Sequence, residues 1–537
     1  MASLVRRDDP PRASVEASAA TVQHPRSAHR AALIRARQHT ALAPTLIGVL
    51  GLVISLAGIG VPSIWYDEAA TIISSTRSWA QLGDMIGNVD AVHALYYAMM
   101  HVIFDLVGYS PVSLRVPSAV AVGGAAALGV VLGRQLGSGR FAILAGLVFC
   151  LLPRTTWMGT EGRSYAITAL LAVALTVVLI QAIRSGARRW WLFYACLVFV
   201  SCLVFIYVAL IVVAHLVSVA WFWRRHRRDA WPAVRGWTVS AGASAIVLVP
   251  FGLLVMSESK QLHWLKPIGE KTLEQVLRDQ WFFDNSLFAA AGWVLLVAGS
   301  AVLLLRGRVS SVTSRTPASG LSPAPTAASV LLPALLVPTL LLLLVTAVYL
   351  PIYTPRYLTM CLPFVALVMA AAIDRLRPRL VATVVVALLV ALMVPTAIDQ
   401  RQPEAKERSS WAAVADLIAE QRALDGPERT TAIIYGGVQY HPIATARVIA
   451  YSYPDAFEDI IDVALDVPAA ETAALWETRY PLAGSLDRLN NADVTYLIAS
   501  VARDIRTPTA QLIAPLGWHE VDAWELSKVH VVKYLRD

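Results

Sequence analysis

The chain has 537 residues, of which 57% belong to the set AVILMFWYC and only 15% are charged, and its mean hydropathy is +0.58. Soluble domains carry about 25% charged residues, so this composition excludes an ordinary soluble globular protein. The net charge of +8 comes from arginines clustered between apolar runs. This pattern is typical of membrane topology signals and argues against a nucleic-acid partner. The four cysteines all lie in apolar runs and predict neither a disulfide framework nor a zinc site.

Residues 1–41 are polar and contain seven arginines, from Arg6 to Arg37. The stretch is too long and too polar for a secretory signal peptide, so we expect a disordered cytoplasmic tail. Weak attraction to anionic lipid is the alternative to a tail that binds nothing. A second stretch at 310–328, rich in Ser, Pro and Ala, also predicts a disordered loop.

Apolar runs near the ~20 residues needed to cross a bilayer recur along residues 42–399. They lie at 42–62, 116–133, 141–158, 165–183, 190–206, 208–223, 237–255, 287–305, 329–350, 357–373 and 380–397. Basic clusters follow every second run, at 134–140, 184–189, 224–235, 306–315 and 375–379. The positive-inside rule therefore predicts about eleven transmembrane helices in the plasma membrane, with a cytoplasmic N-terminus and an extracytoplasmic C-terminus.

The first outer loop contains a further apolar and aromatic segment, His93–Leu106. It is too short to span comfortably, and its far end would reverse the charge pattern. We expect it to lie along the outer interface of the bilayer; a further span is the alternative.

The composition changes after Gln400, and residues 400–537 are much richer in charge. Short β-like runs at 431–437, 494–500 and 530–535 alternate with helical stretches. These helical stretches include Ser410–Ala423 and Ala469–Thr478. The alternation predicts a small α/β domain, which the topology places outside the cell.

Candidate chemistry gathers in the outer loops. Asp67 and Glu68 follow Trp65 and Tyr66 directly after the first span. Two adjacent carboxylates at a bilayer surface are costly to shield from water, so they usually have a function; a solvated helix cap is the alternative.

Two other outer loops supply cations. Glu161, Arg163 and Tyr165 close a short loop, and Arg356-Tyr357 lies at the outer mouth of the tenth span. An arginine there can simply extend to the interface. Arg356 is nevertheless on the side opposite to nearly every other arginine that flanks a span. A fixed cation facing the outer leaflet suits a phosphate.

Aromatic side chains in the same loops, such as Tyr66, Tyr96 and Tyr97, are suited to stacking on a sugar, and His263 lies in the long outer loop 256–286. Acids that remove a proton, cations that bind a leaving phosphate and stacking aromatics thus converge on one membrane face. This convergence indicates an enzyme that uses a lipid-phosphate donor.

Five sequence blocks then carry a family resemblance. They are WYDEAAT (65–71), HALYY (93–97), LRVPSA (114–119), LLPRTTWMGTEGRSYA (151–166) and YTPRYLTMCLP (353–363). In this order they resemble the GT-C superfamily of integral-membrane glycosyltransferases, and within it the protein O-mannosyltransferase and aminoarabinose transferase group. The Ala-, Val- and Arg-rich composition is typical of a high-GC actinobacterium.

The resemblance implies roles for matching residues. Asp67 and Glu68 correspond to the family's Asp-Glu pair, whose Asp acts as base on the acceptor hydroxyl. Arg356 and Tyr357 correspond to an Arg-Tyr pair expected at the donor phosphate. His93 matches a family histidine, although both prolines of the family's His-Pro-Pro-Leu-Tyr-Tyr motif are missing here; a buried interfacial histidine is the alternative.

The block containing Glu161, Arg163 and Tyr165 is likewise expected to bind substrate. The family also implies an inverting enzyme that moves a sugar, with mannose as the commonest donor, from a polyprenyl phosphate to a hydroxyl of a cell-envelope glycan or lipoglycan. A protein acceptor and an arabinose donor are alternatives. No cofactor is certain, and a divalent cation is not expected because the branch resembled here generally needs none. A lipid transporter or scaffold is the non-enzyme alternative.

Overall fold

The computed structural model describes residues 25–313, 324–439 and 443–537. The chain divides into two units between Ala43 and Pro44. Most of the predicted tail and the middle of the predicted loop 310–328 lie outside the described residues. Helix α1 (Pro25–Leu56) begins well before residue 42, so the prediction that the whole of 1–41 is a disordered tail is wrong.

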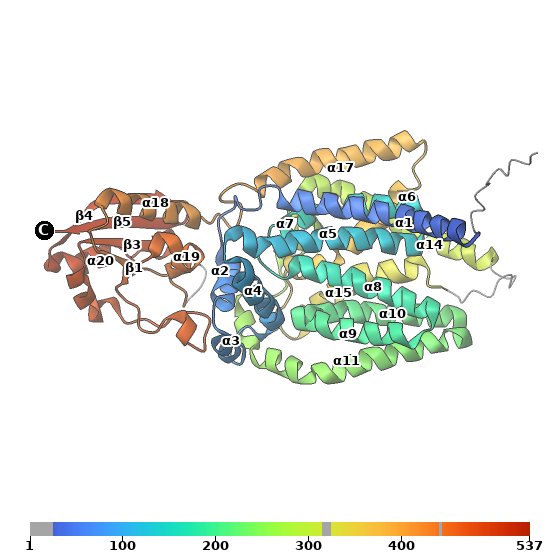
Figure 1. Cartoon of the computed structure of the whole chain (residues 1–537), viewed down its shortest axis with the longest axis horizontal. Helices are drawn as coiled ribbons and strands as arrows, with labels where there is room; N and C mark the ends of the chain where they lie inside the picture. Colours follow the sequence, from blue (N-terminus) through green and yellow to red (C-terminus); the bar gives the residue numbers. More distant parts are fainter. Residues whose placement is uncertain (1–24, 314–323, 440–442) are drawn as a thin grey trace, which may run out of the picture. The chain divides into compact units, whose positions relative to one another are not determined.

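Long apolar helices make up most of the chain before residue 400 (Figure 1). After α1 they are α5 (Pro111–Leu136), α6 (Gly139–Leu151), α8 (Tyr165–Ser185), α9 (Arg188–Val204), α10 (Ala209–His226), α11 (Trp231–Ser257), α14 (Ser286–Thr313), α15 (Ala327–Val348), α16 (Leu362–Ile373) and α17 (Arg379–Asp399). Shorter helices lie in the connections, namely α2 (Tyr66–Ser75), α3 (Trp79–Ile86), α4 (Ala94–Val107), α7 (Pro153–Met158), α12 (Glu270–Glu274) and α13 (Gln280–Phe282).

Within the described residues, seven helical segments are long and apolar enough to cross a membrane. They are Pro111–Leu136, Tyr165–Ser185, Ile206–Ser257, Ser286–Arg306, Ala327–Val348, Pro355–Ile373 and Arg379–Asp399. The protein is therefore a multi-pass membrane protein. Each of the eleven predicted spans overlaps a helix, but the 52-residue segment includes both α10 and α11, and some other helices are short. The count of eleven stays a prediction.

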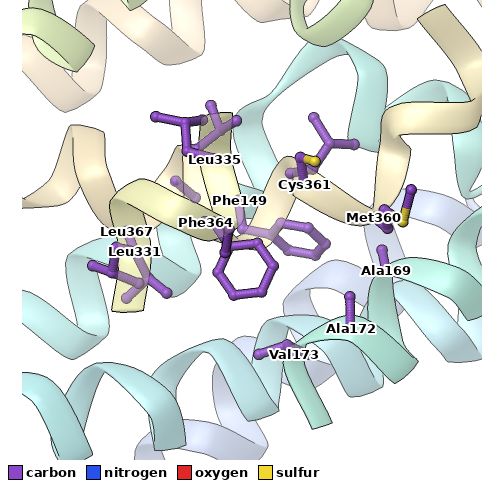
Figure 2. Close-up of a cluster of buried hydrophobic side chains, with 14 of the residues drawn as sticks. Phe149, Ala169, Ala172, Val173, Leu331, Leu335, Met360, Cys361, Phe364 and Leu367 are labelled. Carbon is purple, nitrogen blue, oxygen red and sulfur yellow. The ribbon is translucent and has the colours of Figure 1, made fainter. Parts of the chain in front are cut away.

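Helix α16 forms the centre of the bundle and is buried along its whole length. Figure 2 shows Phe364 and Leu367 of this helix beside Leu331 and Leu335 of α15 and Phe149 of α6. Close packing depends on small residues: a Cβ added at Gly299 of α14 would lie 1.9 Å from the backbone oxygen of Val368. Without a hydrophobic driving force between helices in lipid, such close approach is what holds a bundle together.

Helices α2, α3 and α4 form in the first predicted outer loop. Helix α3 begins at a capping box, in which the hydroxyl of Ser78 accepts from the N–H of Gln81 and the Gln81 side chain accepts from the N–H of Ser78. The predicted interfacial helix His93–Leu106 corresponds to α4, and its depth in the bilayer stays a prediction. Tyr96 and Tyr97 of α4 are buried.

The C-terminal residues form a five-stranded sheet in the order β2-β1-β3-β5-β4. Its strands are β1 (Thr431–Tyr435), β2 (Ile461–Asp462), β3 (Val494–Ser500), β4 (Trp518–Leu526) and β5 (Val529–Arg536). Strands β1, β2 and β3 are parallel, whereas β5 runs antiparallel to both β3 and β4. Helices α18 (Trp411–Asp425), α19 (Arg447–Ser452) and α20 (Arg506–Ile513) complete this small α/β domain.

Strands β1, β3 and β5 match the three predicted β-like runs, and α18 matches the predicted helix Ser410–Ala423. The predicted helix Ala469–Thr478 is wrong, because only a 3₁₀ turn forms there, at Ala469–Glu471. Buried Arg77 donates to the carbonyl oxygens of Thr472 and Ala474 at 2.8 and 2.6 Å. This tertiary contact uses backbone acceptors that an α-helix needs for itself.

Candidate active site

Asp67 and Arg356 form an ion pair at the end of the helical bundle where α2 lies. Arg356 Nη1 is 2.7 Å from Asp67 Oδ2, and their side chains are 18% and 16% exposed. Asp67 lies in the first turn of α2, where the helix dipole favours a carboxylate. Arg356 lies on the 3₁₀ helix Pro355–Cys361. The structure thus brings together the two residues on which the sequence argument depends.

Two indole rings face the guanidinium of Arg356. Its central carbon is 5.6 Å from the ring centroid of Trp65 and 4.9 Å from that of Trp264, which is about half exposed. Aromatic faces hold a cation without neutralising it. The two rings therefore help to fix the position of Arg356 and leave its charge to be balanced by Asp67.

A second buried cation, Arg163, lies beside the first. Its guanidinium is 2.8 Å from His93 Nε2 and donates to the Tyr97 hydroxyl at 3.2 Å and to the backbone oxygen of Asp67 at 3.3 Å. Burial lowers the pKa of His93 well below its usual range, and the charges of Arg163 and Arg356 lower it further. Because an arginine can only donate, Nε2 of the neutral His93 accepts, and its proton is assigned to Nδ1.

Several buried polar atoms around these residues have no hydrogen-bond partner within the described part of the chain. They are His93 Nδ1, Tyr96 Oη, Arg163 Nε and Arg356 Nε. Three of these four atoms are N–H donors. Buried donors without partners are costly, so this arrangement is suited to a ligand that accepts hydrogen bonds.

The remaining predicted aromatics line the same region. Tyr357 packs against Tyr207 with ring centroids 4.8 Å apart, and Tyr165 stacks on Trp157 at 5.6 Å. Tyr66 contacts Trp476 of the C-terminal domain at 5.1 Å. The side chain of His263 lies outside what the structure describes, so its predicted role stays a prediction.

Glu68 has a different environment from its neighbour Asp67. It is fully buried and accepts from Arg115 at both oxygens, 2.8 and 2.7 Å away. It also accepts from the N–H of Gly162 at 2.8 Å and from Lys406 at 3.0 Å. Burial would raise the pKa of Glu68, but Arg115 and Lys406 outweigh it and lower the pKa to about 2. Glu68 is therefore a permanently charged centre of a hydrogen-bond network, and its predicted catalytic role stays a prediction.

Glu161 belongs to the same network rather than to the ion pair of Asp67. Its two oxygens accept from Lys406 at 2.6 Å and from the indole N–H of Trp65 at 3.0 Å. Burial raises the pKa of Glu161 to about 7, against the opposing charge of Lys406. Through Trp65, Glu161 positions one of the rings that face Arg356.

Sequence reasoning missed Arg115 and Lys406. Arg115 lies in the LRVPSA block, on the predicted side opposite to most arginines that flank a span, and this same signal singled out Arg356. Lys406 lies in a charged linker, where no pattern distinguishes it from its neighbours. Among the described residues, no cluster of three or more His, Cys, Asp or Glu side chains is arranged to hold a metal ion.

Arg115→Met is expected to destabilise the protein strongly, by roughly 3–5 kcal/mol, because it leaves the buried carboxylate of Glu68 with Lys406 as its one remaining cation. The change is measured as a fall in the thermal unfolding midpoint of the protein in detergent. Arg278→Met is the matched control, since Arg278 makes exposed ion pairs with Glu274 and Asp284. Equal midpoints for the two variants would contradict the prediction.

Comparison with known proteins shows which solved structures have a similar fold. No family model matches the sequence, and no curated protein matches it. Among solved structures, the chain is similar to ArnT from Cupriavidus metallidurans in the apo state, with a TM-score of 0.58 and 12% identity over 91% of this chain and 97% of that one. It is also similar to ArnT from the same organism bound to undecaprenyl phosphate, with a TM-score of 0.50, 15% identity and the same coverage. The chain has the GT-C fold of integral-membrane glycosyltransferases, as its motif order predicted.

Proposed function

We propose that the protein is an inverting glycosyltransferase that moves a sugar from a polyprenyl-phosphate donor to a hydroxyl acceptor. The Asp67–Arg356 ion pair carries this proposal, because it places a proton acceptor and a phosphate-binding cation side by side. Mannose is the proposed sugar, and a glycan or lipoglycan of the cell envelope is the proposed acceptor. The proposed orientation has the N-terminus in the cytoplasm and this site at the outer face of the plasma membrane.

Donor binding is assigned to the two cations. The phosphate would lie against Arg356 and Arg163, where N–H groups of both side chains have no partner among the described residues. Charge-assisted hydrogen bonds of this kind are short and strong. The ArnT structure bound to undecaprenyl phosphate supports the proposal, because that protein shares the fold and holds a polyprenyl phosphate.

In the proposed reaction, the acceptor oxygen attacks the anomeric carbon from the face opposite to the phosphate. The new carbon–oxygen bond forms as the bond from the carbon to the phosphate oxygen breaks, and the configuration inverts. Asp67 takes the proton of the acceptor hydroxyl, and the leaving group departs as polyprenyl phosphate. Arg356 and Arg163 stabilise the negative charge that develops on the phosphate.

The ion pair also indicates how the base becomes available. In the structure one oxygen of the Asp67 carboxylate is engaged by Arg356 at 2.7 Å. A donor phosphate competes for the same guanidinium and would release the carboxylate toward the acceptor. Donor binding would then activate the base, so that Asp67 is freed when a sugar is in place to react.

A transfer assay tests the proposal. Membranes that contain the protein are incubated with labelled polyprenyl-phosphate mannose, with and without envelope glycolipid, and label in the glycolipid is the expected result. Label in protein would indicate a protein O-mannosyltransferase, and transfer from the arabinose donor alone an arabinosyltransferase. Movement of the intact donor across the bilayer without transfer would indicate a transporter and would overturn the proposal.

A further inference from the structure

The linker between α17 and α18, residues 400–410, is fixed to the end of the helical bundle. Arg401 donates to the carbonyl oxygens of Ile54 and Ala57, both at 2.7 Å. Ser409 donates to the carbonyl oxygen of Ile64 at 2.6 Å. On its other side the linker contacts the C-terminal domain, where Lys528 donates to the carbonyl oxygen of Glu407.

The backbone of the linker turns sharply just after Lys406. Glu407 and Arg408 both have left-handed φ values, of 52° and 56°. Such values cost energy for residues other than glycine and persist only where the surroundings impose them. Here the turn directs the linker into the bundle at Lys406, a side chain that is almost fully buried.

The ammonium group of Lys406 lies between two carboxylates from distant parts of the chain. It is 3.0 Å from Glu68 Oε1, 2.6 Å from Glu161 Oε1 and 2.7 Å from the carbonyl oxygen of Thr160. Both carboxylates are fully buried. Lys406 therefore joins α2 to the loop between α7 and α8.

Both contacts lead back to the ion pair of the candidate active site. Glu68 is the residue next to Asp67 in the first turn of α2. Glu161 holds the indole of Trp65, whose ring faces the guanidinium of Arg356. A displacement of either carboxylate would move one member of the Asp67–Arg356 pair.

We propose that Lys406 is a positioning residue, which fixes Asp67 and Arg356 relative to each other by bridging the buried carboxylates Glu68 and Glu161. The inference rests on the proposed function, and it assigns part of the active-site framework to the linker that leads into the C-terminal domain.

The bridge depends on the positive charge of Lys406, because this charge balances that of a buried carboxylate. The charged groups that face Glu161 are Lys406, Glu68 and Arg115, and the neutral phenols of Tyr96 and Tyr165 lie near it as well. Two cations thus balance two carboxylates, and Arg115 is already engaged by both oxygens of Glu68. Without Lys406, ionised Glu161 would face a like charge on Glu68 in a buried site.

The raised pKa of Glu161 determines how the stability of the folded protein depends on pH. Because burial raises the pKa of Glu161 above its value in the unfolded chain, ionisation of Glu161 opposes folding. This cost grows as the pH rises from the unfolded-state pKa to the folded-state pKa of about 7, and it is constant above that pH. Removal of Lys406 raises that pKa further, so the cost continues to grow above pH 7, where the cost in the wild type is constant.

The first test measures thermal unfolding of the full-length protein in detergent at pH 5 to 8, without substrate. The midpoint of Lys406→Met should continue to fall above pH 7, where the midpoint of the wild type levels off. Adding Glu161→Gln should remove the extra slope, because the double variant has no unpaired carboxylate. Arg401→Met is the matched control, since it removes a linker cation that donates to carbonyl oxygens, and it should lower the midpoint equally at all pH values. A Lys406→Met curve parallel to the wild type would overturn the bridge.

The second test measures transfer of labelled sugar by the same variants. Lys406→Met should slow transfer roughly 10- to 100-fold at pH 8, because small misplacements of catalytic groups have effects of this size. Transfer should recover at pH 6 and in the Lys406→Met/Glu161→Gln double variant. A steeper unfolding slope with an unchanged transfer rate would overturn the positioning role. Absence of transfer by the wild type from any polyprenyl-phosphate sugar would instead overturn the proposed function, and the unfolding curves would still decide whether the bridge exists.

Discussion

Asp67→Asn is expected to abolish sugar transfer while the protein still folds and still binds polyprenyl phosphate. The amide has the size of the carboxylate but cannot take the proton of an acceptor hydroxyl, and a general base contributes about 10²–10⁴-fold to such a reaction. The measurement is the initial rate with labelled polyprenyl-phosphate mannose, together with the thermal unfolding midpoint. The midpoint should change little, because asparagine has the shape of aspartate and its side-chain oxygen can still accept a hydrogen bond from Arg356.

Asp84→Asn is the matched control for this prediction. Asp84 lies on α3 and is exposed, so its substitution makes the same chemical change outside the ion pair. The control should transfer sugar at the wild-type rate. Transfer by Asp67→Asn near that rate would remove Asp67 as the base.

Arg356→Met is expected to weaken the binding of polyprenyl phosphate by roughly 10- to 100-fold, which corresponds to the loss of a hydrogen bond to a charged group. Methionine keeps an apolar side chain between the rings of Trp65 and Trp264, so the loss reports on charge rather than on packing. Binding is measured by titration of the detergent-solubilised protein with the lipid phosphate.

The two substitutions should change binding in opposite directions. Asp67→Asn removes the carboxylate that competes for Arg356, so the lipid phosphate should bind more tightly than to the wild type. Arg278→Met, at an exposed ion pair, should leave binding unchanged. Equal binding by wild type and Arg356→Met would indicate that this arginine only anchors its helix.

Much of the helical fold was predictable because lipid imposes simple rules on sequence. Long apolar runs and the alternation of basic loops indicate the helices and place Asp67 and Arg356 on one membrane face. The same rules do not give distances within that face. The 2.7 Å ion pair required the packing of α2 against the bundle, to which no local pattern points.

The different environments of Asp67 and Glu68 were also not predictable. The two residues are adjacent in the sequence, yet Glu68 is fully buried among Arg115, Gly162 and Lys406, and Asp67 lies in the partly exposed ion pair. Lys406 is more than three hundred residues away in the chain. A contact of this kind depends on the whole fold rather than on neighbouring residues.

Strand β4 is a part of the C-terminal sheet that could not be predicted from the sequence. It lies at the edge of the sheet, and most of its side chains are exposed, so it lacks the alternation of apolar and polar residues that reveals a half-buried strand. Strands β1 and β3 are fully buried and have continuous apolar character, which made them predictable.

The position of β5 between β3 and β4 has a consequence for biosynthesis. The ribosome makes β5 after every other strand of the sheet. Strands β3 and β4 each form hydrogen bonds with β5, which lies between them, so β4 cannot join the sheet until β5 is made. A nascent chain that is already threaded into the membrane therefore holds an unfinished sheet with exposed backbone groups. Closure of this domain would follow insertion of the helices, and a premature stop codon shortly before Val529 would leave the membrane part without its folded partner.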